Sequence, residues 1–224
     1  MENVLFHGSD KIIDHPSLDG GRVHNDFGQG FYCTPSLELA REWACRDRET
    51  AFVNHYSFEP SVQLKVCKLS GAGYHTLNWL AVLMSNRVFE TRHPAPREIK
   101  AYIINEFLPD LSSYDIIRGY RADDSYFDIA ESFISGYISL EMLERALRLG
   151  NLGEQVFLQS QKAFDALVFT TAEYVDKNIY GPRRIARDRK ARESFRKIKS
   201  SVTEGVFALD ILRNKWRNDD VRLR

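Results

Sequence analysis

The sequence predicts an α+β fold with a sizeable hydrophobic core. The chain has 224 residues, of which 43% are hydrophobic and 28% charged, as in folded globular proteins and unlike disordered ones. Helical and strand-like segments alternate without a repeating strand–helix–strand rhythm, which favours α+β over a doubly wound sheet. No signal peptide or membrane-spanning stretch is visible, and three cysteines are too few for a disulfide framework. We therefore expect a reduced, cytoplasmic protein.

The N-terminal half is expected to hold short strands around a glycine-rich loop. Residues 4–6 predict a strand that ends in a turn, and residues 10–29, rich in Gly, Pro and Asn, predict a loop. Further elements are expected in this order: a strand over 30–34, a helix that begins at 35–36, a hairpin of 52–58 and 62–69, and helices over 77–87 and 97–107.

The C-terminal half predicts mixed elements and then a basic helical tail. Its expected elements are a strand over 114–117, helices over 125–134 and 140–149, strands over 154–158 and 166–169, and helix from about 183. Residues 176–224 hold fifteen Lys/Arg against seven Asp/Glu, a net charge of +8 that residues 1–175 balance with −8. We therefore expect a body of residues 1–175 and a basic, mainly helical extension over 176–224 that packs on it; nucleic-acid binding is the alternative role for this tail.

Three segments carry the residues that bear on chemistry. They are residues 5–9 (Leu-Phe-His-Gly-Ser), 25–34 (Asn-Asp-Phe-Gly-Gln-Gly-Phe-Tyr-Cys-Thr) and 153–158 (Gly-Glu-Gln-Val-Phe-Leu). A strand that ends in His-Gly-Ser, then Phe-Gly-x-Gly-Phe-Tyr and a helix, resembles the ADP-ribosyltransferase superfamily. The resemblance is to its branch with a His–Tyr–Glu constellation, which includes the poly(ADP-ribose) polymerases and diphtheria toxin. From residue 48 to about residue 200 the chain is similar only to a bacterial group of stand-alone domains within that superfamily, through residues 122–124, 152–155 and 191–193.

The resemblance implies a split β-sheet core with flanking helices, NAD as the substrate, and a role for each motif residue. His7 would hydrogen-bond a ribose hydroxyl. Gly8 would hold the nicotinamide carboxamide through its backbone, with Ser9 assisting. Tyr32 would stack on the nicotinamide ring. Trp43 lies eleven residues later, the spacing at which the polymerases place a second aromatic residue on the other face of the ring.

The third catalytic element departs from the family pattern. The family places a glutamate at the start of a late strand, where Glu154 and Gln155 compete for the position. Neighbouring strand residues point to opposite faces, so only one of the two can line the cleft. Both faces of this strand are apolar, so the alternation does not decide between them. The bacterial group favours glutamine, and we therefore favour Gln155, which can hydrogen-bond a ribose but supplies no negative charge.

Three further residues are candidates for binding NAD. Arg22 lies in the loop where the family often places a basic contact to the adenosine half. Asp123 and Asp124 precede an expected helix, where they would orient a ribose or the acceptor, or else cap that helix. The six histidines show no metal-ligand spacing, so we expect no metal. Cys33, beside the motif tyrosine, is interpreted as a small apolar strand residue rather than a nucleophile.

These residues suit cleavage of the nicotinamide–ribose bond, which passes through an oxocarbenium-like cation as glycoside hydrolysis does. We expect an NAD-dependent mono-ADP-ribosyltransferase that modifies a protein, or a nucleic acid bound through the basic tail. The alternatives are an NAD glycohydrolase, an inactive NAD-binding or interaction module, and a nucleic-acid-binding protein. The resemblance is also compatible with an inhibitory partner protein, as in a toxin–antitoxin pair, and no membrane partner is expected.

Overall fold

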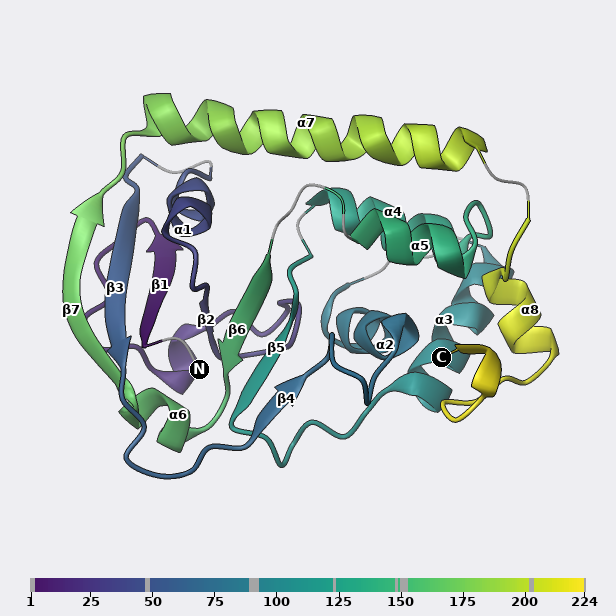
Figure 1. The fold of residues 1–224 in the computed structure, drawn as a ribbon, viewed down its shortest axis with the longest axis horizontal. Helices are drawn as coiled ribbons and strands as arrows, with labels where there is room; N and C mark the ends of the chain where they lie inside the picture. Colours follow the sequence, from purple (N-terminus) through teal and green to yellow (C-terminus); the bar gives the residue numbers. More distant parts are fainter. Residues whose placement is uncertain are drawn as a thin grey trace.

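A computed structural model describes residues 3–46, 49–88, 93–122, 124–147, 149, 153–201 and 204–223. The strands are β1 (Val4–Ser9), β2 (Phe31–Cys33), β3 (Phe52–Phe58), β4 (Val66–Lys68), β5 (Ile116–Tyr120), β6 (Glu154–Leu158) and β7 (Leu167–Tyr174). The helices are α1 (Leu37–Ala44), α2 (Thr76–Asn86), α3 (Pro94–Phe107), α4 (Asp124–Ile134), α5 (Leu140–Leu147), α6 (Gln161–Asp165), α7 (Lys177–Ser201) and α8 (Ala208–Arg213). The strands lie at one side of the molecule, and α2–α5 and α8 form a helical lobe at the other (Figure 1).

The strands form two sheets that meet edge to edge. The first has the order β1-β3-β7 and is antiparallel; the second has the order β2-β6-β5-β4 and contains one parallel pair, β4 with β5. Phe6 of β1 exchanges two backbone hydrogen bonds with Thr34, which follows β2, at 2.8 and 2.9 Å. The predicted α+β class is confirmed, and the split between β1 and β2 leaves room for a pocket.

The predicted hairpin of residues 52–58 and 62–69 is wrong. β3 pairs with β1 and β7, whereas residues 66–68 cross to the second sheet as β4 and pair in parallel with β5. Residue alternation identifies strands but not their partners, and the connection around Pro60 is too long for a tight turn. Helix α6 was not predicted. Ser160 caps it by accepting a hydrogen bond from the amide of Ala163 at 3.2 Å.

The helical lobe is built around α2, which is apolar on all sides. Each residue from 77 to 84 is buried, as expected of a helix that other elements cover completely. Asn78 is the polar residue among them, and its side chain donates to the carbonyl of Phe107 at 2.8 Å and accepts from the amide of His75 at 2.9 Å. A second core lies between the two sheets and includes Cys33, where burial raises the pKa of the thiol.

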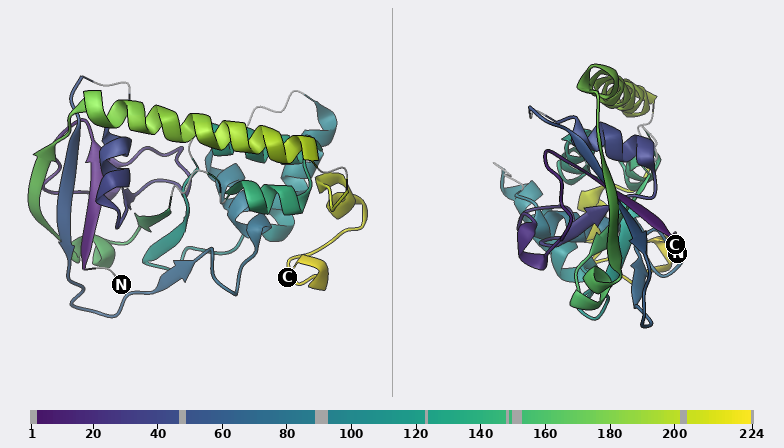
Figure 2. Two further views of the ribbon diagram at one scale, coloured as in Figure 1. Left: turned by 45° about the horizontal axis from the view of Figure 1, so that its top comes forward. Right: turned by 90° about the vertical axis from the view of Figure 1, so that its left-hand side faces the viewer.

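The basic helix α7 lies across the body, along α1 and over the helical lobe (Figures 1 and 2). It begins at Lys177, six residues before the predicted start. Arg187 forms two 2.7 Å hydrogen bonds with Glu42 of α1, and Arg183 pairs with Glu38 at 3.0 Å. Ile198 packs into the core at 8% exposure. The acidic body and the basic extension thus meet through direct ion pairs. Neither α7 nor any other helix in the described part of the chain has the apolar length that a membrane span requires.

Candidate active site

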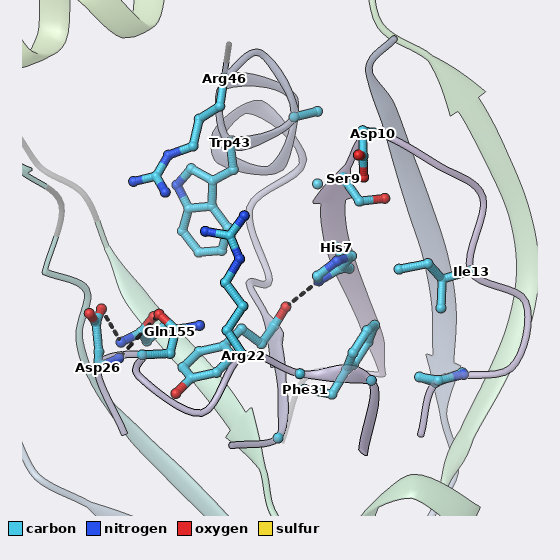
Figure 3. Close-up of a pocket in the computed structure, with 18 of the residues that line it drawn as sticks. His7, Ser9, Asp10, Ile13, Arg22, Asp26, Phe31, Trp43, Arg46 and Gln155 are labelled. Carbon is cyan, nitrogen blue, oxygen red and sulfur yellow. Dashed lines mark hydrogen bonds between the residues drawn. The ribbon is translucent and has the colours of Figure 1, made fainter. Parts of the chain in front are cut away.

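A pocket of about 540 Å³ opens where the two sheets meet. Its lining comes from β1, the loop between β1 and β2, β2 itself, α1, the residues that follow α1, α2 and β5, and β6 (Figure 3). The candidate residues that line it are His7, Gly8, Ser9, Arg22, Tyr32, Trp43 and Gln155. Side chains far apart in the sequence therefore surround a single cavity.

Three candidate residues are not part of this lining as the structure describes it. Glu154 points to the other face of β6, where it pairs with Arg118 at 3.0 Å and accepts a hydrogen bond from Ser70 at 2.5 Å. Asp123 lies outside the described residues, and Asp124 begins α4 with a side chain that is not described. Of the two competing residues of β6, Gln155 is the one that faces the pocket.

His7 is fixed by the neighbouring strand. Its Nδ1 donates a 2.6 Å hydrogen bond to the backbone carbonyl of Tyr32, and its ring stacks on Phe31 with centroids 4.4 Å apart. A carbonyl oxygen can only accept, so Nδ1 carries a proton. In the neutral ring Nε2 is then the acceptor nitrogen, which suits a hydroxyl donor such as that of a ribose.

Gly8 brings the strand, the helix and the pocket together. The backbone N–H and C=O of Phe6 point away from β3 and bond to Thr34. Backbone groups alternate in direction along a strand, so the N–H and C=O of Gly8 point to the same side as those of Phe6. Gly8 lines the pocket on this side. A Cβ at Gly8 would lie 2.2 Å from the carbonyl oxygen of Ala40 and 2.7 Å from the amide nitrogen of Ala44. The glycine is therefore required for α1 to pack on β1, a reason that the sequence did not reveal.

The hydroxyl of Ser9 is engaged within the protein. It donates to the carbonyl of Lys11 and accepts from Nδ2 of Asn54 at 3.0 Å. Asn54 is fully buried in β3, and its Oδ1 also accepts from the amide of Ile13 at 2.8 Å. Ser9 and Asn54 thus hold the beginning of the loop that forms one wall of the pocket.

Tyr32 is held by the loop that precedes it. Its hydroxyl accepts from the amide of Phe27 at 3.0 Å and donates to the carbonyl of Gly28 at 2.7 Å, while its ring packs on Phe157 at 4.7 Å. Gly28 adopts a φ of 97°, a conformation that favours glycine. Burial raises the pKa of the Tyr32 hydroxyl, so the side chain is neutral and acts as an aromatic wall rather than a base.

Trp43 projects from α1 and carries a cation on its ring. The guanidinium carbon of Arg121, in the segment after β5, lies 4.2 Å from the ring centroid. The indole Nε1 is buried without a hydrogen-bond partner among the described residues. Figure 3 shows Trp43 beside Arg46 at one side of the pocket. In this view the Arg22 side chain lies between Trp43 and His7. The aromatic wall is therefore bordered by guanidinium groups.

Gln155 is anchored by a residue to which sequence reasoning assigned no role. Its Nε2 donates to Oδ2 of Asp26 at 3.0 Å, and the same oxygen accepts from the amide of Ala122 at 2.9 Å. Oδ1 of Asp26 accepts from Nε of Arg87 at 2.9 Å. Asp26 is 2% exposed, and so is Gln155. The position of Asp26 within the motif segment of residues 25–34 could have identified it as a candidate site residue. Arg87 lies outside the three motif segments, so no sequence signal pointed to it.

The lining carries more positive than negative charge. Its ionised groups are the cations of Lys11, Arg22, Arg46, Arg87 and Arg121 and the carboxylates of Asp10 and Asp26. Asp26 and Arg87 neutralise each other as an ion pair. The remaining cations still outnumber the remaining carboxylate, that of Asp10, and this positive excess suits an anionic ligand such as a phosphate or pyrophosphate. Among the described residues, no group of three His, Cys, Asp or Glu side chains is arranged to hold a metal ion.

Comparison with known proteins identifies a family but no individual relative. No curated protein and no solved structure matches the chain. A family model matches residues 3–169, a range that includes every residue of the pocket lining and ends within β7, before α7 and α8. The chain therefore belongs to the family described as "Protein of unknown function (DUF3990)".

Proposed function

We propose that this chain is an NAD-dependent mono-ADP-ribosyltransferase that cleaves the nicotinamide–ribose bond and transfers ADP-ribose to a macromolecular acceptor. One observation carries the proposal: His7 of β1, Tyr32 of β2 and Gln155 of β6 line the same pocket. These are the positions to which the resemblance assigns the His–Tyr–Glu constellation. Pockets of several hundred Å³ with aromatic walls and a few polar groups are typical of small-molecule sites.

The nicotinamide, its ribose and the two phosphates of NAD each have a matching group in the pocket. The nicotinamide ring would lie against Tyr32 and beside Trp43, because a cationic ring is attracted to aromatic faces. The N–H and C=O of Gly8 would bind its carboxamide, which needs one donor and one acceptor. Nε2 of His7 would accept from a ribose hydroxyl. The surplus guanidinium groups, with Arg22 among them, would bind the two phosphates.

The same residues suit the chemical step. The bond between the ribose C1′ and the nicotinamide nitrogen breaks, and its electron pair neutralises the pyridinium ring. The ribose becomes an oxocarbenium-like cation, which the carbonyl dipole of Gln155 would stabilise. An acceptor oxygen or nitrogen then attacks C1′ and releases a proton. Because an amide carries no net charge, we expect slow transfer of single units rather than polymer synthesis.

A protein is the acceptor that the charge arrangement favours. The basic tail suggested a nucleic acid, but Arg183, Arg187 and Arg192 of α7 form ion pairs with carboxylates of the body. Three of the ten Lys/Arg side chains of α7 are therefore neutralised, which lowers the charge that the helix offers to a phosphate backbone. The proposed setting is the reducing cytoplasm, where the three free cysteines stay thiols.

Incubation of the folded protein with labelled NAD and a cell lysate tests the proposal. We expect nicotinamide release and label in protein, both lost in His7→Ala and Gln155→Ala and both retained in the matched controls His93→Ala and Glu154→Gln. His93 is exposed outside the pocket, and Glu154 is on the opposite face of β6. Free ADP-ribose without labelled macromolecule would identify a glycohydrolase instead. NAD binding without either product would identify an inactive binding module.

A further inference from the structure

We infer that Asp26 is a positioning residue that fixes the amide of Gln155 with its carbonyl oxygen toward the pocket, and that the charge of Asp26 is the reason for an amide at position 155. The inference rests on the proposed function for its catalytic meaning. Its structural basis is the 3.0 Å hydrogen bond between the two buried side chains (Figure 3).

The surroundings of Gln155 determine which way its amide is turned. Its nitrogen is 3.0 Å from the carboxylate of Asp26 and 3.5 Å from the backbone carbonyl of Tyr120, and both of these groups can only accept. The end of the side chain that faces them must therefore be the NH₂ group. None of the described residues donates a hydrogen bond to Oε1 of Gln155, and the residue lines the pocket. The oxygen is thus left for a ligand.

Asp26 can hold Gln155 because it is itself held from two sides. Arg87 donates to Oδ1, and the amide of Ala122 donates to Oδ2, both at 2.9 Å. Arg87 also donates to the carbonyl of Ala122 at 3.1 Å, which closes a small network around the carboxylate. A buried carboxylate with this many donors is ordered before a ligand arrives, as preorganised catalysis requires.

The charge of Asp26 also explains why position 155 is a glutamine, whereas the superfamily that the chain resembles has a glutamate there. A carboxylate at position 155 would meet that of Asp26 at hydrogen-bond distance in a buried site. Two such groups cannot both be ionised, and one would have to keep a proton, which raises its pKa. The neutral amide avoids this conflict and donates a hydrogen bond instead. Residues 26 and 155 therefore have to be considered as a pair.

Three variants test the pair: Asp26→Asn, Gln155→Glu and the double exchange Asp26→Asn/Gln155→Glu. Their thermal stability is measured from pH 5 to pH 8, together with kcat and KM for nicotinamide release. In Asp26→Asn an NH₂ group replaces one carboxylate oxygen, so Arg87 and Gln155 can no longer both donate to residue 26. With the remaining oxygen kept by the charged Arg87, we expect kcat to fall about 100-fold with little change in KM, because the amide of Gln155 loses its fixed orientation.

The exchange of charge gives a readout that does not depend on turnover. In Gln155→Glu one carboxyl has a raised pKa, so its stabilising proton is lost as the pH rises. We therefore expect the Tm of this variant to fall between about pH 5 and pH 8, while those of the wild type and of the double variant stay level. In the double variant an amide at position 26 can donate to the carboxylate at position 155, so its Tm should exceed that of Gln155→Glu.

The outcomes separate this inference from the proposed function. A wild-type protein that neither releases nicotinamide nor labels an acceptor would overturn the function, whereas the pH dependence of Tm would still decide the pairing. A Gln155→Glu variant as stable and as insensitive to pH as the wild type would overturn the pairing. If that variant does not fold, Asp26→Asn decides alone: wild-type kcat in an active enzyme, or an unchanged Tm in an inactive one, contradicts the inference.

Discussion

Gly8 offers the sharpest test of how the pocket is built. In Gly8→Ala the new Cβ would lie 2.2 Å from the carbonyl oxygen of Ala40, whereas real Cβ contacts stay above 3.0 Å. The neighbouring atom is helix backbone and cannot rotate away, so α1 has to move by roughly 1 Å. Overpacking of this kind costs about 1–3 kcal/mol, which corresponds to a Tm decrease of roughly 2–12 °C in a chain of this size. Because α1 carries Trp43, the substitution also displaces the aromatic wall.

Differential scanning calorimetry and nicotinamide release measure the two consequences of Gly8→Ala. A shift of 1 Å in a positioned group costs about 100-fold in rate, so activity should fall more steeply than stability. Gly73→Ala is the matched control, because a Cβ at Gly73 meets nothing within 4 Å and its φ does not require glycine. A Gly8→Ala variant with the Tm and activity of the control would refute the close approach of β1 and α1.

Three other substitutions have defined outcomes. Gln155→Ala should reduce nicotinamide release about 100- to 1,000-fold in a protein with an unchanged circular dichroism spectrum; near-wild-type release would remove Gln155 from the reaction. Arg187→Ala should destabilise the fold by about 3 kcal/mol in urea unfolding, because it leaves the carboxylate of Glu42, 4% exposed, without its partner; a loss below 1 kcal/mol would mean that water replaces the arginine. The Arg41 guanidinium lowers the pKa of Glu173, so this carboxylate stabilises the fold at neutral pH, and the stabilisation is lost as the pH falls below about 4.5. Arg41→Ala should therefore flatten the pH dependence of Tm in this range. An unchanged pH dependence would contradict the assignment.

The sequence was sufficient to predict most elements but not how the strands pair. The period of two in residues 52–58 and 62–69 identifies extended chain, and β3 and β4 fall within these ranges. Their partners depend on β5 and β7, which lie far along the chain, so local pattern cannot choose between a hairpin and two separate sheets. The divided sheet, which creates the pocket, is therefore a tertiary property.

The candidate site shows the same division between local and long-range information. The resemblance carried by the two N-terminal motifs selected His7, Tyr32 and Trp43, and all three line the pocket. Strand alternation could not separate Glu154 from Gln155, because both faces of this strand read as apolar, and the preference for Gln155 came from the resemblance alone. What separates them is the partner of each side chain: Arg118 on the outer face for Glu154, and Asp26 on the pocket face for Gln155.

The charge distribution acquires a different meaning once the partners are known. The net +8 of residues 176–224 suggested either packing on the acidic body or an anionic partner for the tail, and part of this charge is used within the molecule. Glu42, buried in α1, requires a cation, and Arg187 supplies it from α7. The cations of the pocket lining, in contrast, outnumber the carboxylates there. The pocket lining therefore has the excess of positive charge that the proposed anionic ligand requires, while the tail helps to hold in place the helix that carries Trp43.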